Sequence, residues 1–382
     1  MERIKVVIVG SGPAGLSTAM SLRKVRPAVV SDMVVLDKAV HPRHKLCGGG
    51  VTFTANPTLD YIGASIDSLH IPNLRIDRVR VRYQDKSADL NFPGAFRTVR
   101  RNEFDAALVG RAREQGIEVR EGVAVRNITP HADGGMIVET SDGCILADVL
   151  VGADGAKSRI RRAMNLPGPS RVSRLIEVLT PESPDECPLM HEQRAVFDFT
   201  PFDSKVQGYY WDFPSVKDGT FFMNRGVFDS RVLPDAERAD LRSSLSDAMT
   251  TRGRHLEDYP MEGHPERWYD PEATYSAPHT ILVGDAAGVE PLLGEGIAYA
   301  LMYGPFAARM IDDAIQREDF SFSTYEARLR ASPLGRSMAH RTRMARWCYA
   351  RPAGFFLKVW PVVNLGSRYL AWKSKGALPS FN

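Results

Sequence analysis

The sequence predicts an α/β fold, α+β overall, made of a Rossmann-like nucleotide-binding domain with a parallel sheet, an inserted antiparallel-sheet domain and a C-terminal helical segment. Three observations predict this architecture. An apolar strand near the N-terminus runs directly into a glycine-rich turn and a helix. Residues 171–270 are rich in strand patterns, proline and aromatic side chains. The segment from Ala331 to Asn382 carries nine Lys or Arg residues and no Asp or Glu.

The composition is that of an ordinary globular protein. Its 382 residues are 43% hydrophobic and 25% charged, which excludes a disordered, collagen-like or coiled-coil chain. The four cysteines lie far apart without a CxxC pair, so we predict neither a disulfide framework nor a metal site. Because Met1 leads straight into a strand, we expect no signal peptide and a cytoplasmic location.

The first forty residues predict a strand–helix–strand unit. Ile4–Val9 is a continuous apolar run, typical of a strand buried on both faces. The turn that follows has the GxGxxG pattern, with its glycines at Gly10, Gly12 and Gly15. The first glycine permits a tight turn, the second lets a pyrophosphate approach the backbone, and the third allows close helix–strand packing. A second strand, Met33–Leu36, ends at Asp37, whose carboxylate is placed to accept from a ribose hydroxyl and disfavours a 2′-phosphate.

The remaining elements follow in order along the chain. Residues 100–116 predict a helix, because Phe104, Leu108 and Ala112 recur every fourth residue. Alternating or continuous apolar runs predict strands at Ile76–Tyr83, Val123–Ile128, Met136–Glu139, Val149–Val151 and Thr280–Gly284. A further helix is predicted at Gly296–Ile311.

Two distant segments add to the glycine turn. Val151–Arg161 contains an Asp-Gly pair at Asp154, and Ile281–Gly288 contains a Gly-Asp pair at Asp285, followed by Gly294-Glu-Gly-Ile297. On these motifs the chain resembles the FAD-dependent oxidoreductases built like para-hydroxybenzoate hydroxylase, in which such segments complete one FAD site. The resemblance implies FAD as cofactor and a set of cofactor-binding residues: Gly10, Gly12, Pro13, Ala14, Gly15, Asp37, Lys38, Cys47, Gly48, Gly49, Arg101, Asp154, Asp285, Gly294, Gly296 and Ile297.

Two further motifs narrow the resemblance. Lys45-Leu-Cys-Gly-Gly-Gly50 and Tyr209-Tyr-Trp-Asp-Phe-Pro214 are similar to motifs of the geranylgeranyl reductases, although Val206 replaces a proline that the family usually carries. On a strand, three aromatic residues would share one face: Tyr209, Trp211 and Phe213. We interpret this face as the wall of a substrate pocket for an apolar polyene; the alternative is that it is simply sheet core.

The resemblance implies reduction of carbon–carbon double bonds in an isoprenoid (geranylgeranyl or polyprenyl) lipid, with hydride from N5 of reduced FAD. Cys47 is the candidate acid that protonates the neighbouring carbon, because a thiol is mostly protonated at neutral pH. An inert Cys47 that merely fits beside the flavin is the alternative, and Tyr209 or water would then supply the proton. We therefore assign catalytic roles to Cys47, Tyr209 and Trp211. Since there is no second GxGxxG, electrons are expected from transiently bound NAD(P)H, a ferredoxin-like protein or a quinol.

Two other functions compete with this hypothesis. Gly208–Pro214 is also close to a halogenase motif, which favours an FAD-dependent monooxygenase or halogenase. The other competitor is a non-catalytic flavoprotein tethered to a membrane by its basic tail.

We predict three regions. The FAD-binding domain comprises residues 1–70, 97–165 and 275–310; the substrate-binding sheet domain, 71–96 and 166–274; and the basic, aromatic-rich C-terminal helical segment, 311–382. This segment either packs on the body with its basic face in water or makes peripheral contact with anionic membrane. We do not expect it to span a membrane, because Lys358, Pro361 and Asn364 interrupt its most apolar stretch. No nucleic-acid partner is expected.

Overall fold

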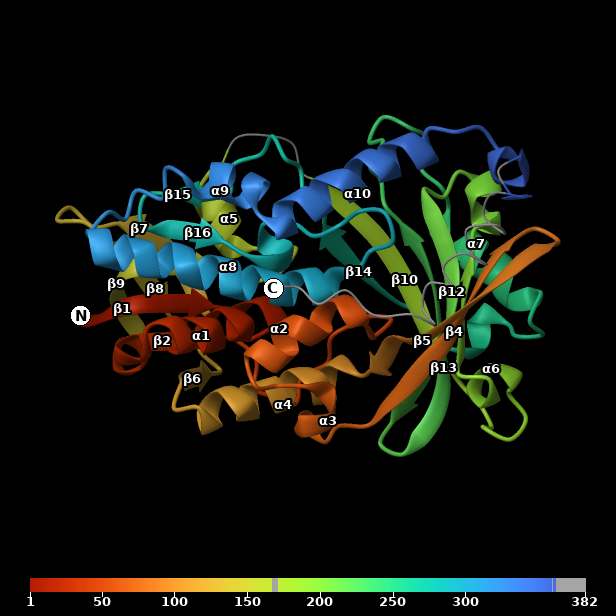
Figure 1. Ribbon diagram of the computed structural model, residues 1–382, viewed down its shortest axis with the longest axis horizontal. Coiled ribbons are helices and arrows are strands. Elements are labelled where there is room, and N and C mark those ends of the chain that lie inside the picture. Colours follow the sequence, from red (N-terminus) through yellow and green to blue (C-terminus); the bar gives the residue numbers. More distant parts are fainter. Residues whose placement is uncertain (167–170, 359, 362–382) are drawn as a thin grey trace.

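The computed structural model describes residues 1–166, 171–358 and 360–361 of the chain. Two sheets organise it, and Figure 1 shows them toward opposite ends of an elongated molecule. The long helices α1 (Pro13–Val25) and α8 (Gly296–Arg317) lie beside the first sheet, whereas α10 (Pro333–Tyr349) extends above the second sheet. The arrangement is the mixed α/β fold that the sequence predicted.

The first sheet has eight strands and a parallel centre. Its parallel strands are β1 (Glu2–Val9), β2 (Met33–Asp37), β6 (Glu118–Glu121), β9 (Gly143–Gly152) and β16 (Thr280–Leu282), in the order β16-β9-β1-β2-β6. The antiparallel strands are β7 (Val125–Pro130), β8 (Met136–Thr140) and β15 (Ser276–Ala277). Val6 of β1 pairs with Met33 on one side and Val149 on the other, and all three are buried. A strand with neighbours on both sides and no exposed face requires the continuous apolar run seen in the sequence.

The second sheet also has eight strands, in the order β14-β10-β13-β12-β11-β4-β5-β3. Their bounds are β3 (Gly50–Thr52), β4 (Asn73–Tyr83), β5 (Lys86–Val99), β10 (Val172–Pro181), β11 (Arg194–Asp198), β12 (Gly208–Lys217), β13 (Thr220–Asp229) and β14 (Glu262–Arg267). All pairs are antiparallel except β11 with β4. Central strand β12 therefore lies between β11 and β13, where its alternate side chains face opposite sides of the sheet.

Three helices form the main packing layer of the first sheet: α1 (Pro13–Val25), α4 (Arg101–Glu114) and α8 (Gly296–Arg317). The other helices are α2 (Asn56–Tyr61), α3 (Ile66–Leu69), α5 (Arg159–Ala163), α6 (Pro188–His191), α7 (Leu241–Thr250), α9 (Tyr325–Ala331) and α10 (Pro333–Tyr349). Short 3₁₀ turns are η1 (Pro27–Asp32), η2 (Phe53–Ala55), η3 (Thr200–Ser204), η4 (Leu256–Asp258) and η5 (Gly284–Ala286). Helices α1 and α8 touch closely, because a Cβ on Gly304 would lie 2.1 Å from Ser17 Oγ. The Ser17 hydroxyl donates to the Leu301 carbonyl across this contact, so the two helices hold a fixed position under the glycine turn.

The elements predicted from apolar patterns are present, with differences in extent. The strand predicted at Val149–Val151 lies at the end of the ten-residue β9. The first part of β9 was not predicted, because apolar and polar residues alternate too weakly from Gly143 to Asp148. Helix α8 continues beyond Ile311 to Arg317. The sequence reasoning missed β5 as a strand and α7 as a helix within the sheet region.

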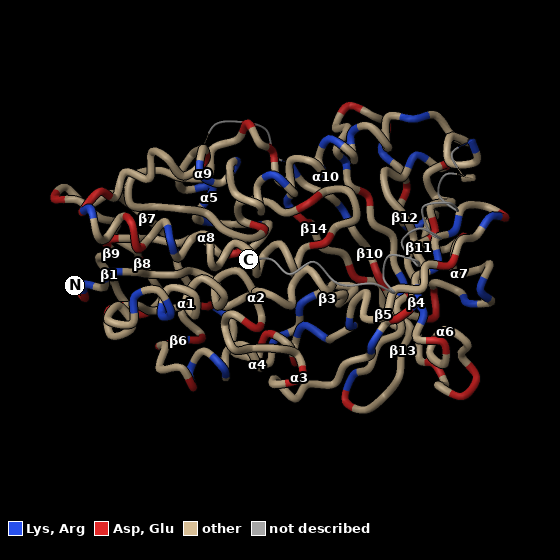
Figure 2. The backbone as a smooth tube through the Cα atoms, viewed as in Figure 1, with Lys and Arg blue, Asp and Glu red and all other residues tan. Residues whose placement is uncertain are grey.

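The C-terminal segment packs on the body through α10. Its side chains Leu334, Met338 and Ala345 are buried, whereas Figure 2 shows Lys and Arg residues along the helix. This is the packed arrangement predicted for the segment; membrane contact stays a prediction. Six basic and aromatic residues of that prediction lie outside the described residues: Arg368, Tyr369, Trp372, Lys373, Lys375 and Phe381. Within the described part of the chain, no helix has the length and apolar character needed to cross a membrane.

Candidate functional site

A cavity of about 990 Å³ extends between the two sheets. This volume is at the upper end of the roughly 300–1,000 Å³ typical of ligand sites. The cavity is lined by the glycine turn, the 43–50 loop, the start of α4, the Asp-Gly segment, β12, β14 and the start of α8. Every residue predicted to bind cofactor or substrate lines it except Gly15, which lies beneath the turn.

The glycine turn has the close packing that its sequence pattern requires. Gly10 has φ +113°, and a Cβ there would lie 2.3 Å from the Ala153 carbonyl oxygen. A Cβ on Gly15 would lie 1.9 Å from the Gly10 carbonyl oxygen, so helix α1 can approach β1 only with glycine at this position. Gly12 differs, because its missing side chain faces the cavity and leaves the N-terminus of α1 open to an anion.

Two arginines cover this open end of α1. The guanidinium Nη2 atoms of Arg43 and Arg101 lie 3.8 and 4.0 Å from the position that a Cβ on Gly12 would take. Arg101 bonds Asp105 through Nε and Nη2 at 2.7 and 2.8 Å, and Arg43 reaches the same carboxylate at 3.0 Å. Burial opposes ionisation of Asp105, but Arg101 and Arg43 hold the pKa of its carboxyl below the usual range. Helix dipole and guanidinium groups together make a site suited to a diphosphate.

The two predicted carboxylates near the turn have partners in the protein. Asp37 accepts from the Ser11 amide and hydroxyl at 2.8 and 2.7 Å, and from the Ala39 amide at 2.9 Å. Asp154 accepts from the Ser158 hydroxyl at 2.5 Å and from the backbone amides at the start of α5. Both side chains still line the cavity, where carboxylate oxygens have further lone pairs for ribose hydroxyls. Lys38 lies beside Asp37 at the same end and is exposed.

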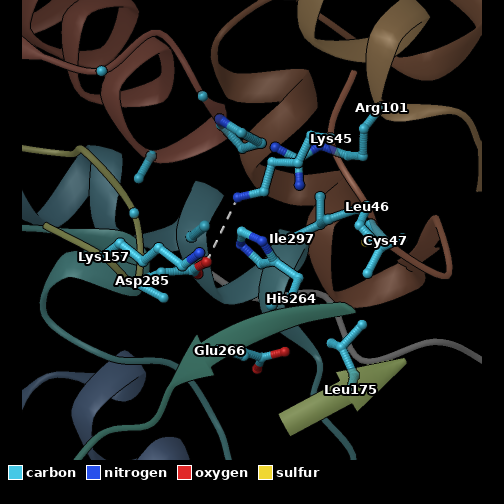
Figure 3. A pocket seen from close by; sticks show the side chains of 18 of the residues that line it. Lys45, Leu46, Cys47, Arg101, Lys157, Leu175, His264, Glu266, Asp285 and Ile297 are labelled. Atoms are coloured by element: carbon cyan, nitrogen blue, oxygen red, sulfur yellow. Dashed lines mark ion pairs between the residues drawn. The ribbon is translucent and has the colours of Figure 1, made fainter. Parts of the chain in front are cut away.

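The middle of the cavity carries opposed charges. Lys45 Nζ lies 3.8 Å from Asp285 Oδ2, the pair joined by a dashed line in Figure 3. Burial and the nearby Arg101 lower the pKa of Lys45, while Asp285 opposes this shift. His264 projects from β14 toward the same region, and burial together with Lys45 lowers its pKa to about 4, so its imidazole is neutral.

The loop before α8 is held in place by hydrogen bonds. The Glu290 carboxylate is fully buried and accepts from the amides of Leu292, Leu293 and Glu295 at 2.7–3.2 Å. Tyr209 donates its hydroxyl to the Leu293 carbonyl at 2.5 Å. Gly294, with φ +66°, packs on the Phe228 ring, where a Cβ would come within 2.8 Å. These contacts present Gly294, Gly296 and Ile297 to the cavity.

The aromatic residues predicted to share a face do so. Tyr209, Trp211 and Phe213 line the cavity, whereas Tyr210 on the opposite face packs in a different core cluster and bonds Asp212. Trp211 Nε1 donates to Asn224 Oδ1 at 2.7 Å, and its ring lies on Gly226, where a Cβ would approach within 2.3 Å. The face is at once cavity wall and part of a buried cluster with further phenylalanines.

Cys47 lines the same cavity as this wall. Figure 3 shows it on the loop that also carries Lys45 and Leu46. Its thiol is half-buried rather than freely exposed, and Sγ accepts from the Gly49 amide at 3.4 Å. A Cβ on the adjacent Gly48 would lie 3.3 Å from the Phe213 ring, so glycine lets the loop pack against the aromatic face. Burial raises the pKa of the Cys47 thiol, and nearby Arg101 opposes this only in part.

Several cavity residues were not identified from the sequence: Arg43, His264, Glu266, Leu175, Phe197 and Phe228. Arg43 stands close to the Lys45–Gly50 motif, and a basic residue near a phosphate loop is a usable signal. The other five lie on strands of the second sheet, and the periodicity of a strand shows only that its side chains alternate between two faces.

The cavity fits an extended dinucleotide with a flavin ring. A diphosphate would sit at Gly12 between the guanidinium groups, ribityl hydroxyls near Asp285, and the ring between the α8 loop and the aromatic wall. The fold and the site define a dinucleotide-binding oxidoreductase.

The chain belongs to the FAD binding domain family, whose model matches residues 3–221. It is therefore an FAD-dependent oxidoreductase. Its resemblance to geranylgeranyl reductases is confirmed by similarity to Methanopyrus kandleri digeranylgeranylglycerophospholipid reductase 2, with 29% identity over 83% of this chain and 79% of that protein. Menaquinone reductase of Mycolicibacterium smegmatis is 27% identical over 81% of this chain and 76% of its own length. The fold is shared with a geranylgeranyl bacteriochlorophyll reductase-like protein of Thermoplasma acidophilum, at TM-score 0.78 and 19% identity, covering 98% and 97% of the two chains.

Replacing Asp285 with alanine is expected to weaken FAD binding by about 1–3 kcal/mol, because the cavity loses a hydrogen-bond acceptor and buried Lys45 loses its opposite charge. Titration of apoprotein with FAD measures this affinity. Asp142→Ala, which removes an exposed carboxylate in a turn, is the control. Equal FAD affinity in the two variants would contradict the role of Asp285.

Proposed function

We propose that this flavoprotein reduces carbon–carbon double bonds of an isoprenoid lipid. The observation that carries the proposal is the continuity of the cavity, which runs from the arginine-covered turn at Gly12 to the aromatic face of β12. The polar end suits the cofactor, and the aromatic end suits an apolar chain. The names of the two relatives, each a reductase of an isoprenoid-containing lipid or quinone, support the same substrate class.

Reduced FAD, when bound, supplies the hydride. The residues of the chain then have three tasks: Trp211 and Phe213 orient the alkene by contact, the Tyr209–Leu293 hydrogen bond holds the α8 loop against the same wall, and Cys47 donates a proton to the second alkene carbon. The raised pKa of Cys47 keeps its proton on sulfur at neutral pH. The aromatic cluster forms an apolar wall at this end of the cavity, so a bound isoprenoid chain would displace water from it.

The electron donor is proposed to be NAD(P)H, a ferredoxin-like protein or a quinol that acts transiently on the same cavity. Peripheral membrane contact through the C-terminal segment would bring a lipid substrate to the enzyme.

A direct test is to reduce the holoprotein with dithionite, incubate it anaerobically with a lipid extract, and search by mass spectrometry for products heavier by two hydrogens. Such products support the proposal. Oxygen-dependent NAD(P)H consumption with a hydroxylated or halogenated product would instead establish a monooxygenase or halogenase. Normal FAD content without either product would indicate a non-catalytic flavoprotein.

Trp211→Ala should lower turnover of a polyprenyl substrate by about tenfold or more, because about 1.5–3 kcal/mol of apolar contact with the chain is lost. FAD content should fall less. Tyr210→Ala is a matched control, since it removes a large buried ring from the same strand on the face that does not line the cavity. If turnover per FAD-loaded molecule is unchanged in Trp211→Ala, the ring serves only as core.

A further inference from the structure

Glu266 is a carboxylate inside the cavity that the proposed mechanism does not use. It lies on β14, pairs in register with Ser173 of β10, and projects from the same strand as His264 in Figure 3. Its carboxyl atoms lie 3.8 Å from the position that a Cβ on Gly296 would take. The side chain thus faces the start of α8, where the second sheet meets the loop before α8.

This carboxyl group is buried without a full set of partners. Glu266 is 8% exposed, and its Oε1 atom has no hydrogen-bond partner among the described residues. A buried polar atom that lacks a partner carries a substantial free-energy cost, which a bound ligand with a matching atom would remove. The fully buried Glu290, by contrast, has its oxygens occupied by backbone amides.

The charges around Glu266 favour its neutral form. Burial and the facing carboxylates of Asp285 and Glu290 raise the pKa of Glu266 well above its usual value, and Lys45 opposes this only in part. His264, on the same face of β14, adds no positive charge because its imidazole is neutral. A protonated carboxyl has one O–H donor, and Glu266 is among the residues that line the ligand cavity.

Apolar side chains line the cavity together with Glu266. Leu175, Phe228 and Leu293 line the same part of the cavity and pack with Tyr209. Burial raises the pKa of Tyr209, and Glu290 and Glu266 add to the shift, which indicates that the carboxyl groups act on this end of the aromatic wall. The Tyr209 hydroxyl is already bonded to Leu293, whereas Glu266 Oε1 has no hydrogen-bond partner among the described residues.

We propose that Glu266 donates a hydrogen bond to an uncharged oxygen atom of the substrate, so that the isoprenoid accepted here carries a carbonyl or ether oxygen beside its chain. This inference rests on the proposed function and specifies its substrate class. A diphosphate-bearing isoprenoid fits less well, because Asp285 and Glu290 would repel its negative charge. A quinone and a glycerol ether would both offer Glu266 the same group, an uncharged oxygen that accepts a hydrogen bond.

The experiment measures ligand binding to oxidised holoprotein, without turnover, by flavin absorbance and Trp fluorescence. The ligands all carry one geranylgeranyl chain: a naphthoquinone, a glycerol ether, a diphosphate and the plain hydrocarbon. The variants are Glu266→Leu, which removes the donor, and Glu266→Gln, which keeps a donor but cannot ionise. Glu257→Leu is the control, since this carboxylate is exposed and does not line the cavity.

We expect Glu266→Leu to weaken binding of the quinone or the ether by roughly tenfold, and binding of the hydrocarbon by much less. The ligand with the larger loss identifies the oxygen source. Glu266→Gln should retain the affinity. In the wild type, affinity for that ligand should fall as pH rises and Glu266 loses its proton, whereas Glu266→Gln should show no such fall. Glu257→Leu should resemble the wild type.

Equal losses for oxygen-bearing ligand and hydrocarbon in Glu266→Leu would overturn the inference and make Glu266 a wall residue. Tightest wild-type binding of the diphosphate would overturn it as well. A changed flavin spectrum or FAD affinity without ligand selectivity would mean that the carboxyl pairs with the cofactor instead. Selective quinone or ether binding without any alkene reduction would refute the proposed function and leave the Glu266 assignment standing. Binding of none of the isoprenoids would refute both.

Discussion

Replacing Arg101 with methionine is expected to destabilise the folded apoprotein by about 3–5 kcal/mol. Arg101 is 6% exposed, and its partner Asp105 is fully buried. Without the guanidinium group, the carboxylate would keep Arg43, at 3.0 Å, as its ion-pair partner among the described residues. Urea unfolding of the apoprotein measures the loss. FAD affinity should fall too, since Arg101 lies over the proposed diphosphate position at Gly12.

The double variant Arg101→Met/Asp105→Leu separates these two effects. Removing both charges leaves no unpaired buried carboxylate, so most of the lost stability should return. FAD affinity should remain low, because the guanidinium group is still missing. A double variant as unstable as Arg101→Met would show that the pair is not the source of the instability. Full recovery of FAD affinity would exclude Arg101 from the cofactor site.

Cys47→Ser should lower the rate of alkene reduction by about 10²-fold or more, with FAD content close to that of the wild type. Serine has nearly the size of cysteine and can still accept from the Gly49 amide, so the loop should persist. Its hydroxyl is a far weaker acid than a thiol, and proton donation should slow accordingly. Single-turnover oxidation of the reduced holoprotein by substrate measures the rate.

The pH dependence gives a second measurement of the same role. Donation requires the protonated thiol, and burial raises the pKa of Cys47, so the wild-type rate should be constant near neutrality and fall only in alkaline solution. Cys47→Ser should lack this alkaline fall. Cys348→Ser, a half-buried thiol that does not line the cavity, is the control and should behave as wild type. A Cys47→Ser rate equal to that of the wild type would leave water or Tyr209 as the proton source.

The parts of the site that follow from local rules could be predicted from the sequence. The glycine turn is one, because only glycine avoids the 1.9 Å approach at Gly15 and tolerates the positive φ of Gly10. The shared face of Tyr209, Trp211 and Phe213 is another, since side chains alternate on any strand. The position of Cys47 beside this face required the resemblance, because no local pattern brings together residues more than 160 positions apart.

The sequence by itself determined the fold class and the glycine turn, because short-range periodicity and backbone sterics decide these, and its motifs indicated FAD and the aromatic wall through their resemblance to a known family. Only the tertiary structure decided which charges meet there. Arg43 pairs with Asp105, Lys45 faces Asp285, and one oxygen of Glu266 has no partner in the described part of the chain. The strands and loops that carry these groups are far apart in the chain, so their partners depend on sheet register and on how the two sheets enclose the cavity. Burial there removes the water that would otherwise screen each charge, and it is this desolvation that turns ordinary side chains into a neutral acid, a paired cation and a protonated thiol.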